Sequence, residues 1–252
     1  LQMNEGVNIS IGQNDNSNFK GALQANGVTF TRGVDNSDDR WEYIKFSNYS
    51  SDDSSFIENS TIEYADMGLY LTDASPTITN TIFQHNQIGI ENNGDSSPLI
   101  TGNTFKEQTG STVRYNNPYG INKNIYGNTY TDNVQQYISV NGGNIYSNGR
   151  RTWLADGVPY LLTSDLTIEA DNNSEHLGVL HIEEGTTVQM NEGVNIFIGH
   201  DDNANLRGAL QANGVTFTRG VDNSEGRWEY IKFRNYSSDD SSFIENSTIE
   251  YA

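Results

Sequence analysis

The feature of this sequence that most limits its fold is an internal repeat. Residues 2–65 return as residues 189–252, shifted by 187 positions. Nine of the 64 paired positions differ, namely Ser10/Phe197, Gln13/His200, Asn14/Asp201, Ser17/Ala204, Phe19/Leu206, Lys20/Arg207, Asp38/Glu225, Asp39/Gly226 and Ser47/Arg234. Near-identity that extends to polar residues predicts a tandem array of similar units. We expect this chain to hold about one and a third units of a longer array, which favours an extended structural or adhesive molecule.

Composition disfavours several kinds of partner and excludes cysteine-based sites. Thirty-three acidic residues against 14 basic ones give a formal charge of −19, which disfavours nucleic acid and anionic membranes as partners. The absence of cysteine excludes disulfides, a thiol catalyst and a cysteine zinc site. The apolar fraction is only 34%, and no apolar run is long enough to be inserted in a membrane. We therefore expect an exported protein, extracellular or attached to the cell surface.

Short runs rich in β-branched and aromatic residues follow one another, broken by Gly, Asn and Asp. A shorter period appears within the 187-residue repeat: similar segments contain Asn59, Asn80, Asn103 and Asn128, at intervals of 21, 23 and 25 residues. Two or three short strands in each period of roughly 22 residues is typical of a parallel β-solenoid. We call one such turn of the solenoid a coil, and we expect an all-β fold with very little helix.

The recurring asparagines have a physical explanation in such a fold. Asn tolerates left-handed backbone angles where a coil bends, and its amide can bond to the coils above and below. Stacked amides would form a satisfied, buried polar ladder. The spacing therefore predicts a structural ladder made of Asn59, Asn80, Asn103, Asn128 and Asn246.

Several segments carry a family resemblance, and they cover most of the chain. Residues 177–190 resemble an opening coil with a Glu-x-Gly-Thr turn, and residues 208–218, 228–233 and 242–252 follow in order as later coils, with Ser75-Pro76 and Ser97-Pro98 in the first copy. In these segments the chain resembles the right-handed parallel β-helix repeat proteins of prokaryotic cell surfaces, relatives in fold of pectate lyases. The resemblance implies a right-handed β-helix and no particular reaction.

The stretch from 116 to 157 has the weakest resemblance, and residues 157–168 resemble the first strand of a new β-helix. We place a boundary near residue 145. Residues 1–145 would form the rear part of one β-helix unit, and residues 146–252 the front part of the next.

A catalytic set is hard to assemble from this sequence. Lyases on this fold need a cationic base beside carboxylates, and Arg114 and Lys106 with Glu91 and Asp95 are the nearest candidates. A carboxylate pair would need Asp residues on neighbouring coils, as in Asp52, Asp73 and Asp95. Solvated strand charges and turn formation explain these residues more simply. His85 is interpreted as a turn residue and His181 as a packed or rim residue.

Calcium is the one cofactor for which the sequence offers a pattern. The candidates are alternating oxygen side chains in two equivalent segments, Asn14, Asn16 and Asn18 in one and Asp201, Asn203 and Asn205 in the other. These segments lack the glycine and distal glutamate of a calcium loop, and an Asx-rich turn explains them without metal. Both interpretations stay open at this point.

A polysaccharide is a second candidate partner, because six tyrosines lie between Tyr115 and Tyr146 and exposed rings can stack on sugars. Packing between coils explains the same rings. The sequence thus favours a non-enzymatic extracellular structural or adhesive protein, forming a fibre, stalk or surface-layer element through head-to-tail contacts between its own repeat units. The alternative is a carbohydrate-active or carbohydrate-binding β-helix, either a polysaccharide lyase or a hydrolase, which rests on fold analogy alone.

Overall fold

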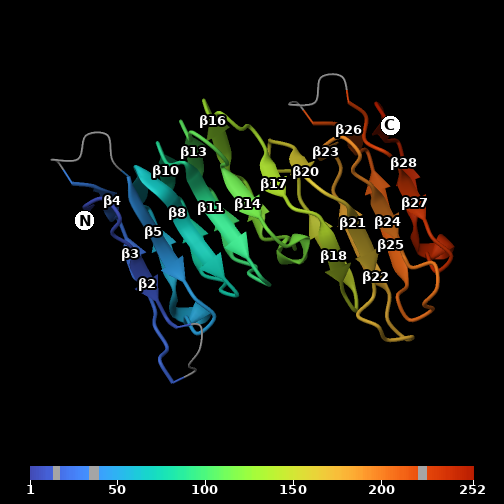
Figure 1. Ribbon diagram of the computed structural model, residues 1–252, viewed down its shortest axis with the longest axis horizontal. Coiled ribbons are helices and arrows are strands. Elements are labelled where there is room, and N and C mark those ends of the chain that lie inside the picture. The colour runs from blue at the N-terminus through green and yellow to red at the C-terminus, as the bar shows by residue number, and fades with distance from the viewer. Residues whose placement is uncertain (14–17, 34–39, 221–225) are drawn as a thin grey trace. The chain divides into compact units, whose positions relative to one another are not determined.

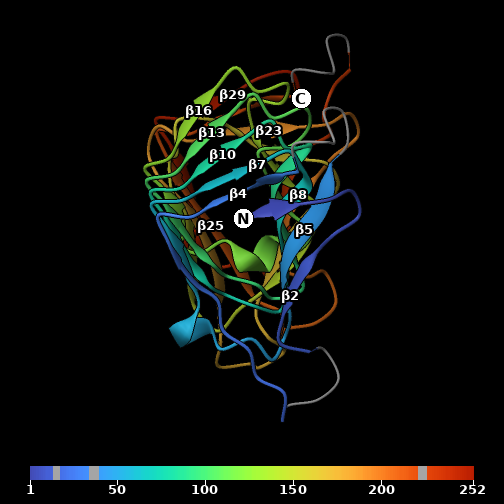
Figure 2. The same ribbon diagram turned by 90° about the vertical axis from the view of Figure 1, so that its left-hand side faces the viewer.

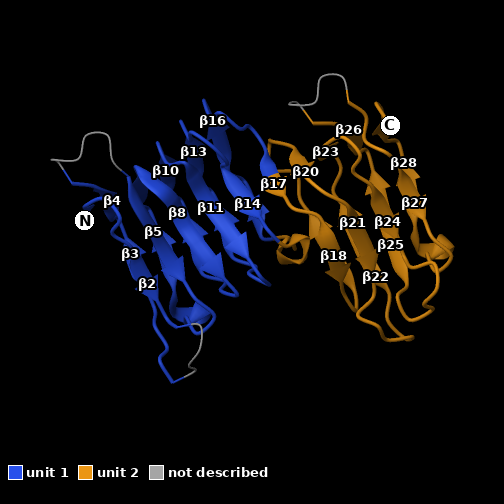
Figure 3. Ribbon diagram, in the orientation of Figure 1, with its two compact units in different colours: residues 1–116, 124–138 blue, residues 117–123, 139–252 orange. Residues whose placement is uncertain are grey.

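The computed structural model describes residues 1–13, 18–33, 40–220 and 226–252. The chain divides into two compact units, residues 1–116 with 124–138, and residues 117–123 with 139–252 (Figure 3). Strand β17 (Ile138–Val140) lies at the division. The boundary that the repeat predicts near residue 145 stays a prediction.

Unit 1 is built from three parallel sheets, each made of strands from successive coils (Figure 1). The first contains β1 (Gln2–Met3), β4 (Thr29–Arg32), β7 (Thr61–Glu63), β10 (Ile82–Gln84), β13 (Thr104–Lys106) and β16 (Thr129–Thr131). The second contains β2 (Ile9–Ile11), β5 (Trp41–Phe46), β8 (Ala65–Thr72), β11 (Ile88–Asn93) and β14 (Val113–Tyr115). The third contains β3 (Gln24–Asn26), β6 (Phe56–Glu58), β9 (Thr77–Thr79), β12 (Leu99–Thr101) and β15 (Ile125–Tyr126). Figure 2 shows the stacking of the first sheet from β4 to β16.

Unit 2 follows the same plan. Its sheets contain β18 (Gly143–Tyr146), β21 (Leu166–Glu169), β24 (Ile196–Ile198) and β27 (Ile231–Phe233); β19 (Arg150–Trp153), β22 (Gly178–Ile182), β25 (Gly208–Asn213) and β28 (Phe243–Glu245); and β20 (Tyr160–Leu162), β23 (Thr187–Met190), β26 (Thr216–Arg219) and β29 (Thr248–Ile249). The helical elements described are three short 3-10 turns, η1 (Asp52–Ser54), η2 (Pro118–Gly120) and η3 (Asp239–Ser241). The expectation of an all-β, solenoid-like fold with very little helix is confirmed.

Left-handed turns end the short strands and set the coil shape. Asn59 and Asn80 have φ of +49°, and the strand register places them in line with Gly102 and Gly127, whose φ values are +68° and +67°. Asn and Gly are the residues that adopt this conformation at least cost. The same corner therefore recurs in these successive coils of unit 1, which keeps their strands in register.

Stacked side chains from successive coils fill the interior. In unit 1, the strand register aligns one residue from each of four successive coils, in the order Ile62, Phe83, Phe105 and Tyr130. The ring centroids of Phe83 and Phe105 lie 5.0 Å apart, and those of Phe105 and Tyr130 lie 5.3 Å apart, nearly parallel in both cases. Each coil thus buries its apolar residues against its neighbours, and a thin core suffices. Among the described residues, no helix has the length and apolar character needed to cross a membrane.

Candidate functional site

The register separates the predicted asparagine ladder into two different rows. Asn59 and Asn80 lie exposed at the left-handed corner, in line with Gly102 and Gly127, and Asn246 is exposed with the same φ of +49°. Asn103 and Asn128 are one position further along, in line with Ser60 and Thr81. The single ladder of five asparagines is therefore corrected. The later coils carry a glycine at the corner, which moves their asparagine inward by one residue.

The inner row, residues Val28, Ser60, Thr81, Asn103 and Asn128, forms a continuous series of hydrogen bonds from coil to coil. The backbone N–H of each residue donates to the side-chain oxygen of the next, over 3.1, 3.4, 2.9 and 2.9 Å. Asn103 is buried, and its Nδ2 also donates to the carbonyl of Ile78 at 3.0 Å. This row satisfies backbone groups that point away from the sheets, as the ladder argument required.

A second inner row was missed from the sequence. Asn86 accepts from the N–H of Ala65 at 2.9 Å and donates to the carbonyl of Ile62, and Asn133 bonds in the same way to Gln108 and Phe105. Asn86, Gln108 and Asn133 are all buried. Their spacings of 22 and 25 residues were the available signal, but the change from Asn to Gln hid it.

The calcium candidates that the structure describes make contacts with protein groups. Asn14 and Asn16 lie outside the described residues, and Asn18 is exposed. Asp201 Oδ2 lies 3.2 Å from Lys232 Nζ and 3.9 Å from Arg234 Nε, so its charge is already compensated. The hydrogen bond from Lys232 lowers the pKa of the Asp201 carboxyl, with Asn235 and Arg234 acting in the same direction.

The other two candidates in this segment form a local turn. Asn203 Oδ1 accepts from the N–H of Asn205 at 3.0 Å, and Asn203 Nδ2 donates to Asn172 Oδ1 at 3.3 Å. Within the part of the chain that the structure describes, no group of three or more His, Cys, Asp or Glu residues could hold a metal ion. The Asx-turn interpretation of residues 201–205 accounts for these contacts.

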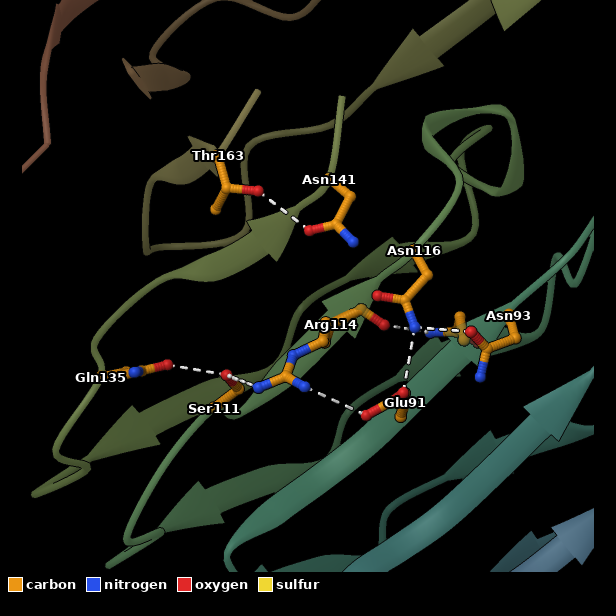
Figure 4. Close-up of polar contacts among 9 residues, drawn as sticks. Glu91, Asn93, Ser111, Arg114, Asn116, Gln135, Asn141 and Thr163 are labelled. Carbon is orange, nitrogen blue, oxygen red and sulfur yellow. Dashed lines mark hydrogen bonds and ion pairs between the residues drawn. The ribbon is translucent and has the colours of Figure 1, made fainter. Parts of the chain in front are cut away.

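Arg114 and Glu91 belong to a polar network on β11 and β14 (Figure 4). Arg114 Nη1 lies 3.3 Å from Glu91 Oε2, and Asn116 Nδ2 donates to Glu91 Oε1 at 3.0 Å. Arg114 Nη2 donates to Ser111 Oγ, which donates to Gln135. In unit 2, the Thr163 hydroxyl bonds to Asn141 (Figure 4). The Glu91 carboxylate is thus occupied by its neighbours.

The remaining members of the proposed lyase set are dispersed. Lys106 lies on β13, in a different sheet from Arg114. Asp73 and Asp95 lie in neighbouring turns, where the Asp95 N–H donates to Asp73 Oδ1 at 2.8 Å. Asp52 begins η1 and accepts from Ser50 Oγ at 3.2 Å. Asp73 and Asp52 thus accept hydrogen bonds within turn segments.

The two histidines considered as catalytic bases lie in different surroundings. His85 occupies a turn with φ of +57°, stacks on Tyr64 at 5.0 Å, and its Nε2 lies 3.3 Å from Glu107 Oε2. His181 lies on β22 beside Thr152 and Gln211. Burial lowers the pKa of the His181 imidazole, with nearby Arg150 acting in the same direction. Neither histidine faces a paired nucleophile in these contacts.

The tyrosines do not form one exposed row. Tyr115 and Tyr137 are buried, Tyr130 stacks on Phe105, and Tyr126 and Tyr146 are exposed. The guanidinium of Arg151 lies over the Tyr119 ring, with its Cζ 3.6 Å from the ring centroid. A continuous aromatic platform for a sugar chain is therefore not formed by these six rings.

Two further groups were not found from the sequence. Arg40 crosses three coils: it donates to the carbonyls of Ala65 and His85 and to the hydroxyl of Thr109. Glu169 is a buried carboxylate whose Oε2 has no hydrogen-bond partner. Neither residue belongs to a recognisable motif, because its partners lie tens of residues away in the sequence.

Comparison of the chain with protein-family models, with curated proteins and with solved structures finds no match.

Proposed function

We propose that the chain is a non-enzymatic structural part of an extracellular or cell-surface array, in which successive right-handed β-helix units stack end to end. The handedness follows the strong preference of parallel β-connections for the right-handed sense. The array itself follows from the near-identity of residues 2–65 and 189–252.

One observation carries this proposal: the same apolar residues, in copy one (residues 2–65) and in copy two (residues 189–252), are fully buried only where a further coil pairs with them. Phe46 and Ile62 are 0% exposed, whereas their equivalents Phe233 and Ile249 are 42% and 50% exposed. In copy one the covering strands are β8, β9 and β10 of the next coil. An apolar strand edge of this kind favours pairing with a further coil.

The occupant we propose for the uncovered face of copy two is another coil of the same protein. Residues 65–84 already cover the equivalent face of copy one, so the complementary shape exists within this sequence. Such head-to-tail contacts are heterologous and extend into fibres or stalks instead of closing into a two-fold dimer.

Sedimentation velocity over a range of concentrations tests this function. We expect the chain to associate end to end, and Phe233→Lys or Ile249→Lys to abolish association by placing a charge on the uncovered face. Val134→Lys is the matched control, since Val134 is an exposed apolar residue that belongs to unit 1 and not to that face. A chain that stays monomeric at every concentration, or Lys variants that associate unchanged, would contradict the proposal. Runs with and without a calcium chelator separate a calcium-tightened stack from a purely protein one.

The alternative, a carbohydrate-binding or carbohydrate-active β-helix, is supported by one specific feature. On the second sheet of unit 1, Lys45 Nζ lies 5.2 Å from the Tyr70 ring and Tyr43 lies 5.6 Å from it. An aromatic pair beside a cation can take an acidic sugar. Binding of acidic polysaccharide that is lost in Tyr70→Ala would favour this second function.

A further inference from the structure

The differences between the two copies are concentrated at one place in the coil. Seven of the nine lie either between residues 197 and 207 or at Arg234, in copy-two numbering. Three of them form one cluster, because the Arg234 guanidinium lies over the Phe197 ring at 3.9 Å, and Arg234 Nε lies 3.9 Å from Asp201 Oδ2. The equivalent residues of copy one are Ser47, Ser10 and Asn14, which carry no charge.

The coil that precedes copy two places a buried acid beside this cluster. Glu169 ends β21, is 3% exposed, and its Oε2 lacks a hydrogen-bond partner. Extending the strand register of β21, β24 and β27 by one residue aligns Glu169 with Gly199 and then with Arg234. Gly199 has no side chain to separate them, and Arg234 Nη1 reaches back to its carbonyl at 3.5 Å.

We infer that Arg234, with His200, is the charge partner of the buried Glu169 carboxylate, and that this pairing makes the joint between β21 and copy two selective for copy two. Three groups act electrostatically on the Glu169 carboxyl: the Tyr146 hydroxyl on β18, His200 after β24 and Arg234 after β27. Burial raises the pKa of the Glu169 carboxyl, while His200, Arg234 and the hydrogen bond from Tyr146 act to lower it. Asp201 and Lys232 pair with each other next to Arg234.

The consequence for the array follows from the residues of copy one. A coil bearing Glu169 that stacked on copy one would meet Ser47 and Gln13 where copy two offers Arg234 and His200. A buried carboxylate without a cation is strongly disfavoured. The face of copy one formed by Ile9–Ile11 therefore fits a coil that carries an uncharged residue at the Glu169 position. This selectivity rests on the proposed end-to-end function, whereas the charge pairing does not.

The test uses the whole chain and four variants: Arg234→Ser, which installs the copy-one residue, Glu169→Gln, the double variant, and Arg151→Ser. The last is a matched control, an arginine of the same unit that also stacks on an aromatic ring but does not face Glu169. We expect Arg234→Ser to lower the thermal midpoint by about 3 to 6 °C at about pH 8. The loss should shrink in a second series at acidic pH, because protonation of Glu169 removes the charge that Arg234 pairs with. In the Glu169→Gln background, Arg234→Ser should lower the thermal midpoint much less than it does in the unsubstituted chain.

A direct readout separates charge pairing from packing. In carbon-13 NMR with labelled glutamate, the Glu169 carboxyl is the signal missing from Glu169→Gln, and Arg234→Ser should move its titration midpoint upward while Arg151→Ser leaves it in place. An equal loss of thermal stability at both pH values, unrelieved by Glu169→Gln, would overturn the pairing and assign Arg234 to packing on Phe197. A failure of end-to-end association with intact coupling would overturn only the array.

Discussion

In copy one, residues 41–63 lie between two coils of the same unit, whereas the equivalent residues 228–250 of copy two have a paired coil on one side only. The sequences are almost the same, but the strands are not. Trp41–Phe46 forms a strand of six residues in copy one, and only Ile231–Phe233 does so in copy two. Earlier in each copy the longer strand belongs to copy two, since Gly208–Asn213 is longer than its copy-one equivalent, Gln24–Asn26.

This difference shows that the exposed fraction of a side chain depends on the neighbouring coils as much as on the residue itself. Each coil contributes half of two interfaces, so stability is close to a sum of coil and nearest-neighbour terms. The two copies form natural pairs of test positions, because the same substitution can be made with and without a covering coil.

The largest expected difference concerns Phe46 and Phe233. At concentrations low enough to keep the chain monomeric, Phe46→Ala removes a fully buried ring and should destabilise by about 3 to 5 kcal/mol, whereas Phe233→Ala should cost less than about 1 kcal/mol because its ring is partly in water. Urea unfolding monitored by circular dichroism measures both. Equal losses would mean that the face of copy two is covered in solution, for example by a second molecule.

The two rows at the coil corner provide the next comparison. Asn103→Gly should destabilise by about 1 to 3 kcal/mol, because it leaves the Thr81 N–H and the Ile78 carbonyl without their side-chain partner. Asn80→Gly should change stability by less than about 0.5 kcal/mol, since glycine already occupies this corner at positions 102 and 127. Urea melts of both variants measure this difference. A large loss in Asn80→Gly would restore the single-row ladder.

Arg40 and Arg227 are equivalent residues with different numbers of partners. Arg40 donates to three coils, and burial lowers the pKa of its guanidinium, while Arg227 donates to the Ala252 carbonyl at 2.7 Å. Arg40→Ala should therefore cost about 1 to 2 kcal/mol and Arg227→Ala about 0.5 kcal/mol or less. Hydrogen exchange at Ala65 to Thr109 should rise only in Arg40→Ala. Unchanged exchange there would contradict a bridging role for Arg40.

The stacked strands could be predicted from the sequence, whereas the two rows at the corner and the pairing of Glu169 with Arg234 could not. Periodic apolar runs predict stacked parallel strands because each coil solves the same packing problem, and the structure has them. The ladder was misaligned because a corner glycine at 102 and 127 shifts the inner asparagine by one residue, and a spacing count cannot detect this. Glu169 and Arg234 were missed since they meet only through register, 65 positions apart in the sequence.

The smallest expected effect concerns Asp201, the residue that copy one replaces with Asn14. The hydrogen bond from Lys232 lowers the pKa of Asp201 in the folded state, so its contribution to stability is present above the pKa of an unfolded aspartate and is lost as the pH falls through the folded value. Asp201→Asn should therefore remove a slight stabilisation at neutral pH and leave acid stability unchanged, because exposed ion pairs contribute little. Thermal midpoints from about pH 7 down to about pH 3 measure this. Because Arg234 lies within 3.9 Å, the same variant in the Arg234→Ser background shows whether the pair with Lys232 alone suffices. If Asp201→Asn instead costs as much as Arg234→Ser, the cluster acts as one cooperative network, and the selectivity of copy two would depend on Asp201 as well as on the partner of Glu169.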